Sequence, residues 1–157
     1  IRSFSLILQY LQKNGYVPIR IGEYSRHQHE ASVEYLELPE LRRFDKDLVT
    51  VYLASACAMF LGSASGAIHL ATIWGRPIFS INNLPYYCIR PYPANSMGIP
   101  KLMSVNGQVL NVHEIFERGF HLYRTDEEYE KNGLEYKMNE PSDCFDDFLE
   151  LCKRDKN

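Results

Sequence analysis

The sequence predicts an α/β protein in which helices cover both faces of an open parallel sheet. Short apolar runs alternate along the chain with segments of helical periodicity, and the turns between them are short. This alternation favours parallel strands, because the crossover between neighbouring parallel strands is usually a helix that packs on the sheet. The composition, 45% hydrophobic and 24% charged over 157 residues, is that of a globular chain with one sizeable core.

The N-terminal part of the chain predicts a helix followed by short strands. Apolar residues recur at helical spacing from Ser3 to Asn14, and Gly15 follows at the position where helices commonly end. Residues 16–21 predict a strand, in which Pro18 indicates a sheet edge or a strand end. Residues 33–36 alternate between apolar and polar and predict a second strand.

A second helix is expected after Asp45 or Asp47, since either aspartate is a suitable N-cap residue. Apolar residues of this segment recur at helical spacing and are expected to form its buried face. They are Leu48, Val51, Tyr52 and Ala56.

A strand–helix–strand unit forms the centre of the predicted sheet. Residues 58–61 predict a short buried strand, and a helix is expected from about Ser65 to Trp74, closed by Gly75. Residues 77–81 predict the next strand, which Asn82-Asn83 would end.

The rest of the chain is less regular. Residues 84–100 predict a long loop rich in Pro and Tyr, and loops of this length in compact domains are often functional. Residues 101–105 predict a short strand, and residues 109–118 predict a strand end and a helix. Residues 142–153 predict a C-terminal helix with Ser142 as its cap and acidic residues in its first turn.

These patterns divide the chain into two parts. Residues 1–118 are predicted to form the α/β domain, and residues 119–157 a charged linker and the C-terminal helix, which would pack on that domain or on a further one. Because the sequence opens at Ile1 within a helical pattern, we expect it to be a piece of a longer protein.

The strongest functional signal is the turn from Gly62 to Gly66, between the central strand and the helix after it. Free N–H groups at the start of a helix favour an anion, and glycine lets a phosphate approach the backbone closely. The hydroxyls of Ser63 and Ser65 add donors. The alternative is structural, because Ser65 is also an ordinary N-cap residue and small residues let a helix pack tightly on a sheet.

The composition argues against several classes of partner. A net charge of −3 gives no reason to expect nucleic acid or an anionic membrane surface. No apolar run approaches the ~20 residues that span a membrane, and no signal peptide is visible. The four cysteines form no CxxC pair, which favours a reducing compartment and argues against a zinc site. We therefore expect a cytoplasmic protein.

Four segments occur in an order that resembles a known family. They run from Tyr16 to Gly22, from Asp47 to Leu53, from Phe60 to Gly66 and from Pro77 to Asn82. This order resembles the C-terminal half of a family of bacterial glycosyltransferases with the two-domain GT-B architecture. The segment Ser65-Gly66-x-x-His69-Leu70-Ala71 is also similar to the donor-site motif of ADP-heptose:lipopolysaccharide heptosyltransferases. The resemblance covers about residues 1 to 117 and leaves the tail after Gly119 without a counterpart.

This resemblance implies a Rossmann-like domain that binds a nucleotide-diphosphate sugar at the carboxyl ends of its strands. The pyrophosphate of the donor would then lie at the Gly62–Gly66 turn, whose donors would stabilise the departing phosphate. No Asp-x-Asp cluster stands in a suitable loop, so metal-independent transfer without a cofactor fits better. The glycan or lipid-linked acceptor, and the base that activates it, would belong to an N-terminal domain that this sequence lacks. The chain alone is therefore expected to be inactive.

Four further residues join the turn as candidate substrate-binding residues, each with a structural alternative. Arg20 ends the first strand and suits phosphate or acceptor, or a surface ion pair, and Gly22 follows it in the same motif. His69 is expected to bind phosphate or ribose, or to pack in a helix face. Asn82, with Asn83 beside it, would reach the nucleotide or sugar hydroxyls, or would simply form a turn.

Weaker candidates lie in the polar segments. Glu23 is a possible contact to a ribose or acceptor hydroxyl, and His27-x-His29 has a metal-like spacing without a third ligand nearby, which favours a solvated loop. Aromatic and basic residues of the long loop would line the sugar or acceptor cleft, or only pack the loop. They are Tyr86, Tyr87, Arg90 and Tyr92.

Two other functions are compatible with the same pattern. A nucleotide-sugar 2-epimerase shares the architecture, although it normally places more acidic and histidine residues around the cleft. A Rossmann-like binding or scaffold module without catalysis is the non-enzymatic alternative, since a fold does not determine chemistry. Affinity for nucleotide-diphosphate sugars separates both enzymes from the scaffold.

Overall fold

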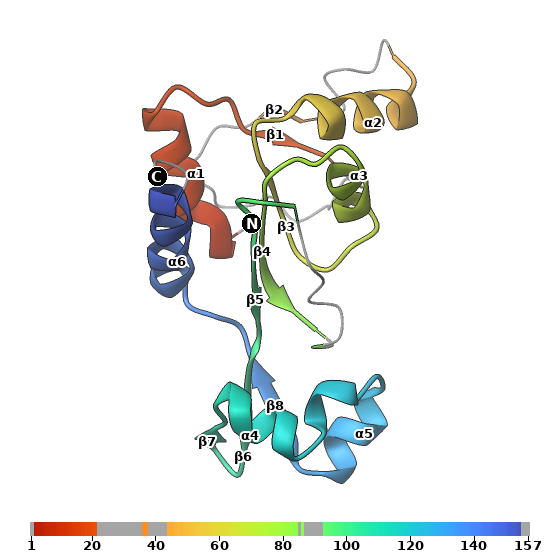
Figure 1. Ribbon diagram of the computed structural model, residues 1–157, viewed down its shortest axis with the longest axis vertical. Coiled ribbons are helices and arrows are strands. Elements are labelled where there is room, and N and C mark those ends of the chain that lie inside the picture. Colours follow the sequence, from red (N-terminus) through yellow and green to blue (C-terminus); the bar gives the residue numbers. More distant parts are fainter. Residues whose placement is uncertain (1, 22–35, 38–43, 85, 87–92, 155–157) are drawn as a thin grey trace.

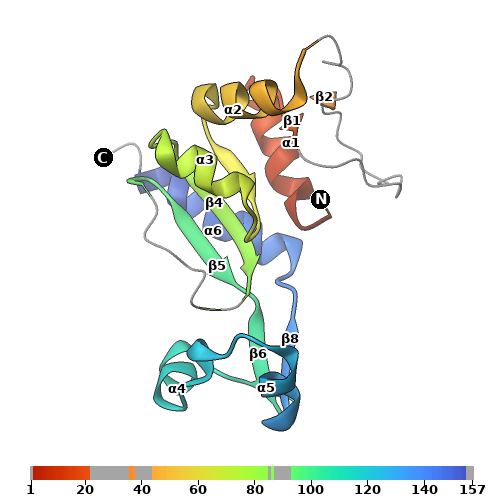
Figure 2. The ribbon, with the colours of Figure 1, turned by 90° about the vertical axis from the view of Figure 1, so that its right-hand side faces the viewer.

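The structure, a computed structural model, describes residues 2–21, 36–37, 44–84, 86 and 93–154. Within these residues the fold is mixed α/β, as the sequence predicts, and it has two lobes (Figure 1). We call the larger one, built on a parallel sheet, the sheet lobe. The small lobe comprises residues 101–138. It is joined to the sheet lobe at the carboxyl end of the parallel strands (Figures 1 and 2).

The sheet lobe is built on a three-stranded parallel sheet with the strand order β3-β4-β5. The strands are β3 (Phe60–Gly62), β4 (Ile78–Asn83) and β5 (Met97–Pro100). Gly62 lies opposite Ser80, and Asn83 lies opposite Pro100, so the carboxyl ends of the strands meet at one edge. β5 was not predicted, because its residues belong to the Pro- and Tyr-rich segment that the sequence indicates as a loop.

Helices cover both faces of this sheet, because alternate residues of β4 point to opposite sides. Phe79 and Ile81 pack against α1 (Ser5–Lys13) and α6 (Pro141–Arg154), together with the short helix η1 (Arg2–Phe4). Phe148 of α6 meets Phe79 edge-to-face at 5.4 Å between ring centroids. The C-terminal helix therefore packs on this domain, which is one of the two positions the sequence allows.

The opposite face of the sheet carries α3 (Ala67–Ile73), whose Ile68 and Ala71 pack against Phe60 and Ile78. α2 (Lys46–Ala56) packs beside α3. Asp45, one of the two predicted caps, does cap α2. Its carboxylate accepts hydrogen bonds from the backbone N–H groups of Asp47 and Leu48, at 3.0 and 2.9 Å.

The apolar face predicted for α2 is wrong. Leu48 and Tyr52 are 67% and 66% exposed, and Val51 is exposed as well. Among the residues of α2, only Ala54 is buried. Helical periodicity identifies an apolar stripe, but the short α2 turns its other side toward α3 and leaves this stripe outside.

A second parallel pair, β1 (Ile19–Arg20) with β2 (Leu36–Glu37), is separate from the three-stranded sheet within the described residues. The described parallel strands therefore form two groups, β1–β2 and β3–β4–β5. β1 is also shorter than the predicted strand, because Tyr16 and Val17 are exposed and Pro18 has no N–H for a ladder. Most of the second predicted strand, residues 33–35, lies outside the described residues.

The small lobe has an antiparallel three-stranded sheet in the order β7-β6-β8, with helices against it. Its hydrophobic cluster is separate from those of the sheet lobe and includes Met103, Ile115 and Tyr129. The strands are β6 (Leu102–Val105), β7 (Gln108–Val109) and β8 (Leu134–Lys137). The helices are α4 (Val112–Glu117), η4 (Phe120–Leu122) and α5 (Asp126–Lys131).

The two hydrophobic cores divide the chain differently from the boundary predicted at residue 118. The small-lobe core joins residues on both sides of that position, and α6 then returns to the sheet lobe (Figure 1). Residues 126–131 and 134–137, expected to be linker, form α5 and β8. Ser142 is not the cap of the last helix, because α6 already begins at Pro141.

Candidate functional site

The turn between β3 and α3 lies at the carboxyl end of β3 and is exposed from Ser63 to Gly66. α3 begins at Ala67 with Gly66 at its N-cap, so the helix starts slightly later than the predicted Ser65. No side chain caps it, whereas Asp45 caps α2, and Asn111 and Thr125 cap α4 and α5. The first N–H groups of α3, like those of α1, thus have no side-chain acceptor.

The hydrogen-bond donors of this turn are only partly used. The N–H group of Ile68 donates to the carbonyl oxygen of Ser65 at 3.3 Å, and the next N–H group donates to Gly66 at 3.2 Å. Within the described residues, nothing accepts from the N–H groups of Ser65, Gly66 and Ala67 or pairs with the hydroxyls of Ser63 and Ser65. These groups are open to a bound acceptor.

Gly62 and Gly66, the two glycines of the turn, differ in the space that a side chain would find at each position. A Cβ on Gly62 would lie 2.8 Å from Cε1 of Phe60. The ring of Phe60 therefore fills the space beside Gly62 in which a phosphate is expected from the sequence. At Gly66 no atom lies within 4 Å of the position of a Cβ, and its φ of −59° suits any residue. Of the two, Gly66 alone leaves open space at the turn.

His69 lies on the first turn of α3 with its side chain exposed. It is thus on the same short segment as Ser63, Ser65 and Gly66, and these four predicted site residues come together. Arg20 lies in the separate β1–β2 pair and is not without an interaction partner. Gly22 lies outside the described residues.

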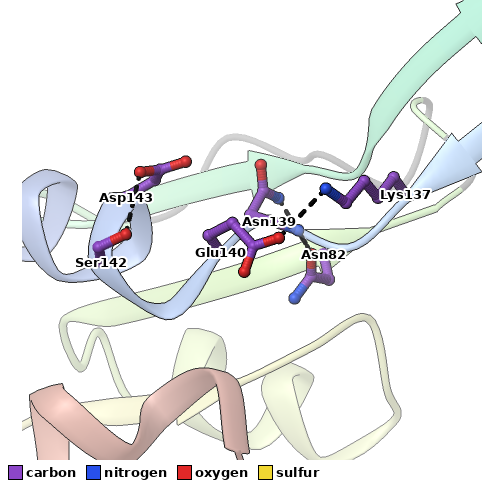
Figure 3. A network of polar contacts seen from close by, with 6 residues as sticks. All are labelled: Asn82, Lys137, Asn139, Glu140, Ser142 and Asp143. Carbon is purple, nitrogen blue, oxygen red and sulfur yellow. Dashed lines mark hydrogen bonds and ion pairs between the residues drawn. The ribbon is translucent and has the colours of Figure 1, made fainter. Parts of the chain in front are cut away.

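Asn82 uses its side-chain oxygen within the protein. Its Oδ1 accepts hydrogen bonds from the backbone N–H and the Nδ2 of Asn139, at 2.8 and 3.0 Å. Nδ2 of Asn139 also donates to the carbonyl oxygen of Pro100 at 2.7 Å. Asn82 therefore ties the end of β4 to the segment before α6 (Figure 3).

Asn83 is buried beside Asn82. Its Nδ2 donates to Oγ of Ser80 at 2.9 Å and to the carbonyl oxygen of Ile99 at 3.2 Å. Its Oδ1 has no hydrogen-bond partner among the described residues. The side chain thus links β4 to β5 and holds one unpaired acceptor at the carboxyl end of the sheet.

The predicted cleft-lining aromatic that the structure describes, Tyr86, is instead part of the small-lobe core. Its hydroxyl donates to the carbonyl oxygen of Lys101 at 3.0 Å, and burial raises the pKa of the phenol. The remaining loop and metal-like candidates lie outside the described residues: Glu23, His27, His29, Tyr87, Arg90 and Tyr92.

The residue that sequence reasoning missed is Asn139. It stands in an irregular polar segment without periodicity, and the only signal for it was its position just before a predicted helix, which also fits a solvated turn. Nothing local indicates that it is buried and bonded to residues 57 and 39 positions away.

Within the described residues, no cluster of three or more His, Cys, Asp or Glu side chains is arranged to hold a metal ion. No helix in this part of the chain combines the length and apolar character that crossing a membrane requires. Cys57, Cys144 and Cys152 are free thiols, and burial raises the pKa of Cys57 and of Cys144.

Comparison with known proteins finds no family model, no curated protein and no solved structure that matches this chain. The function is therefore inferred from the turn after β3 and from the order of the sequence motifs.

Proposed function

We propose that the chain is the donor-binding domain of a glycosyltransferase with GT-B architecture. In this proposal it binds a nucleotide-diphosphate sugar with the pyrophosphate at the turn from Ser63 to Gly66. The sugar is transferred in the cytoplasm to a cell-surface glycan or lipid-linked acceptor held by an N-terminal domain. The order of the four sequence motifs supports this assignment, and so does the position of the turn at the carboxyl end of a parallel strand.

The observation that carries the proposal is the open space at Gly66. Neither the backbone angle nor the packing of the described residues requires a glycine there. Glycine is a common N-cap residue, and it also lets a ligand approach the backbone closely. The free N–H groups beside it are the donors that such a ligand would use, so the proposal does not depend on the dipole of the short helix α3.

The chemistry follows from these donors. When the bond between the anomeric carbon and the diphosphate breaks, negative charge develops on the departing phosphate. N–H and hydroxyl groups that already face this oxygen stabilise the charge without reorganisation, which lowers the barrier. The N–H groups of Ser65 and Gly66 and the hydroxyls of Ser63 and Ser65 would have this role, with His69 at the edge of the site.

A thermal-shift and calorimetric screen against UDP, GDP, ADP, CMP and their sugars tests the proposal. A ligand present at 100 times its Kd stabilises the chain by about 2.7 kcal/mol, which is readily detected. Ser65→Asp should abolish the shift, because its carboxylate would repel the phosphates, whereas Ser65→Asn has the same size without the charge and should retain most of it. Gly66→Ala should weaken binding while it leaves folding intact.

The outcomes separate the candidate functions. Binding of one nucleotide diphosphate that is lost in Ser65→Asp supports the donor site and identifies the base. Absence of binding to any of these nucleotides removes the pyrophosphate assignment and favours a scaffold. Once a nucleotide sugar that binds is known, analysis of the products formed by the longer protein separates transfer from epimerisation.

A further inference from the structure

The small lobe is joined to the sheet lobe at the edge where the proposed donor site lies. The chain enters the small lobe directly from β5 into β6 and leaves it from β8 toward α6 (Figures 1 and 2). The arrowhead of β4 points toward this lobe in Figure 1. Whatever fixes the angle between the lobes therefore also fixes how closely the small lobe approaches the carboxyl ends of β3 and β4.

Asn82, Asn139 and Pro100 form a polar latch at this junction. Figure 3 shows the contact between Asn82 and Asn139. Pro100 is the last residue of β5, Asn82 is near the end of β4, and Asn139 follows β8. The three hydrogen bonds thus connect the strand that enters the small lobe, the segment that leaves it and the central strand of the parallel sheet. The Lys137–Glu140 ion pair beside the latch is exposed and adds little.

The orientation of both amide groups is determined by their backbone partners. The backbone N–H of Asn139 can only donate, so Asn82 must present its oxygen to it. The carbonyl of Pro100 can only accept, so Asn139 must present its nitrogen to it. The same nitrogen then donates to Oδ1 of Asn82, and the latch has a single consistent arrangement of donors and acceptors.

Burial and backbone geometry favour this arrangement. Asn139 is only 8% exposed, so its polar atoms would cost free energy if they lost their partners. Asn82 has a φ of +56°, in the left-handed region that asparagine and aspartate adopt more readily than other side chains. This backbone angle coincides with the irregular register between β4 and β5 from Ser80 to Asn83.

We propose that Asn139 is a positioning residue: the latch that it forms with Asn82 and Pro100 holds the small lobe beside the donor site. This inference rests on the proposed function for its effect on ligand binding. Its effect on the orientation of the small lobe does not depend on that function. Asn82, a ligand-binding candidate in the sequence, acts in this proposal through Asn139.

Two isosteric substitutions test the latch because they make the same chemical change in its two partners. Asn82→Asp keeps an oxygen acceptor for both donors of Asn139 and a residue suited to the left-handed angle, so the latch should persist. Asn139→Asp replaces the donating nitrogen with an oxygen that faces two acceptors, so at pH 8 the latch should open. Asn139→Ala removes the side-chain bonds without adding charge and serves if Asn139→Asp does not fold.

Residual dipolar couplings of backbone amides in β3–β5 and β6–β8 report the angle between the lobes. One alignment tensor should fit both lobes in the wild type and in Asn82→Asp, and separate tensors should be needed for Asn139→Asp or Asn139→Ala. A single tensor in every variant overturns the proposal. If a nucleotide binds, its Kd should rise about fivefold or more in Asn139→Ala relative to the wild type. It should rise by a similar factor in Asn139→Asp relative to Asn82→Asp, which adds the same charge and keeps the latch.

The two proposals can fail separately. If no nucleotide binds the wild type, the proposed function fails, and the dipolar couplings still decide whether the latch holds the lobe. If a nucleotide binds with the same Kd in all variants although the lobe moves in Asn139→Asp, the positioning role is overturned and the donor site remains.

Discussion

At the scale of single residues, the two glycines around the turn after β3 have opposite reasons to be glycine. Gly62 is required by packing, because the ring of buried Phe60 fills the place of its missing Cβ. Gly66 stands in open space with a helical backbone angle. Of these two glycines, four positions apart in one motif, only Gly62 has a packing reason, and the proposed ligand would supply the reason for Gly66.

We expect Gly62→Ala to destabilise the protein by about 1–3 kcal/mol, the usual cost of overpacking a filled site. Gly66→Ala should change the free energy of unfolding by less than about 0.5 kcal/mol, as for other exposed positions. Urea denaturation followed by circular dichroism measures both. Equal losses of stability in the two variants would show that Gly66 also has a packing role, and the space at the turn would then need another explanation.

Asparagine residues mark the limit of what the sequence can tell at this scale. A strand followed by Asn82-Asn83 fits a ligand contact and a turn equally well, because the amide both donates and accepts. The outcome depends on Asn139, which is distant in the sequence. The residues from Ser63 to His69 were predictable as a group because they are contiguous, whereas the latch depends on tertiary pairing.

At the scale of elements, α6 carries a charge arrangement that works against its stability at neutral pH. Burial, and then the nearby carboxylates of Asp143 and Asp146, raise the pKa of Asp147 above its ordinary value of 3.8. Because the folded state holds this proton more tightly than the unfolded chain, the contribution is present below the ordinary pKa. It is lost as the pH rises through the raised pKa.

Asp147→Asn should therefore stabilise the protein at neutral pH, by roughly 0.2–0.5 kcal/mol, the scale of a like-charge pair one helical turn apart. The advantage should shrink as the pH falls toward the ordinary pKa of aspartate and disappear below it. Thermal unfolding of both proteins between pH 3 and pH 8 checks this, with exposed Asp126→Asn as a control that removes a charge from the first turn of another helix. An advantage that grows on acidification would contradict the assigned sign.

Helix α2 shows that apolar periodicity predicts the presence of a helix better than it predicts which face of the helix is buried. The start of the helix after Asp45 was predictable, since a cap depends on neighbouring residues. The apolar stripe that includes Leu48 and Tyr52 was equally clear, but the structure leaves it exposed. Which side of a short helix meets its neighbour depends on the packing partner, and the local pattern does not contain that information.

At the scale of the whole molecule, the sequence predicted β3 and β4 of the sheet lobe, and it predicted β6 and α4 without indicating that they belong to a second lobe with α5 and β8. Short, highly charged segments such as Asp126–Lys131 do not show an apolar stripe, although Tyr129 alone anchors that helix in its core. The strand Leu134–Lys137 buries only its first residue. An element that buries only one side chain has no apolar pattern of its own in the sequence. Such elements become evident only from the core that their buried side chains form together.

The separate cores predict that the lobes lose structure separately. Ile115 is buried in the small-lobe core and Phe148 in the core between α1, α6 and the sheet. Ile115→Ala should cost about 2–5 kcal/mol and Phe148→Ala about 3–5 kcal/mol, each mainly within its own lobe. Hydrogen exchange should then accelerate in β6 and β8 for the first variant, and in α1, β4 and α6 for the second.

Exchange that accelerates equally in both lobes for both variants would mean that the molecule opens as one cooperative unit, with the junction as strong as the cores. The latch at Asn139 makes the combined variant informative. If the latch couples the lobes, Ile115→Ala should accelerate hydrogen exchange in the sheet lobe less when it is combined with Asn139→Ala than when it is made alone. The reason is that a loss of structure in β8 then no longer reaches β4 through Asn82.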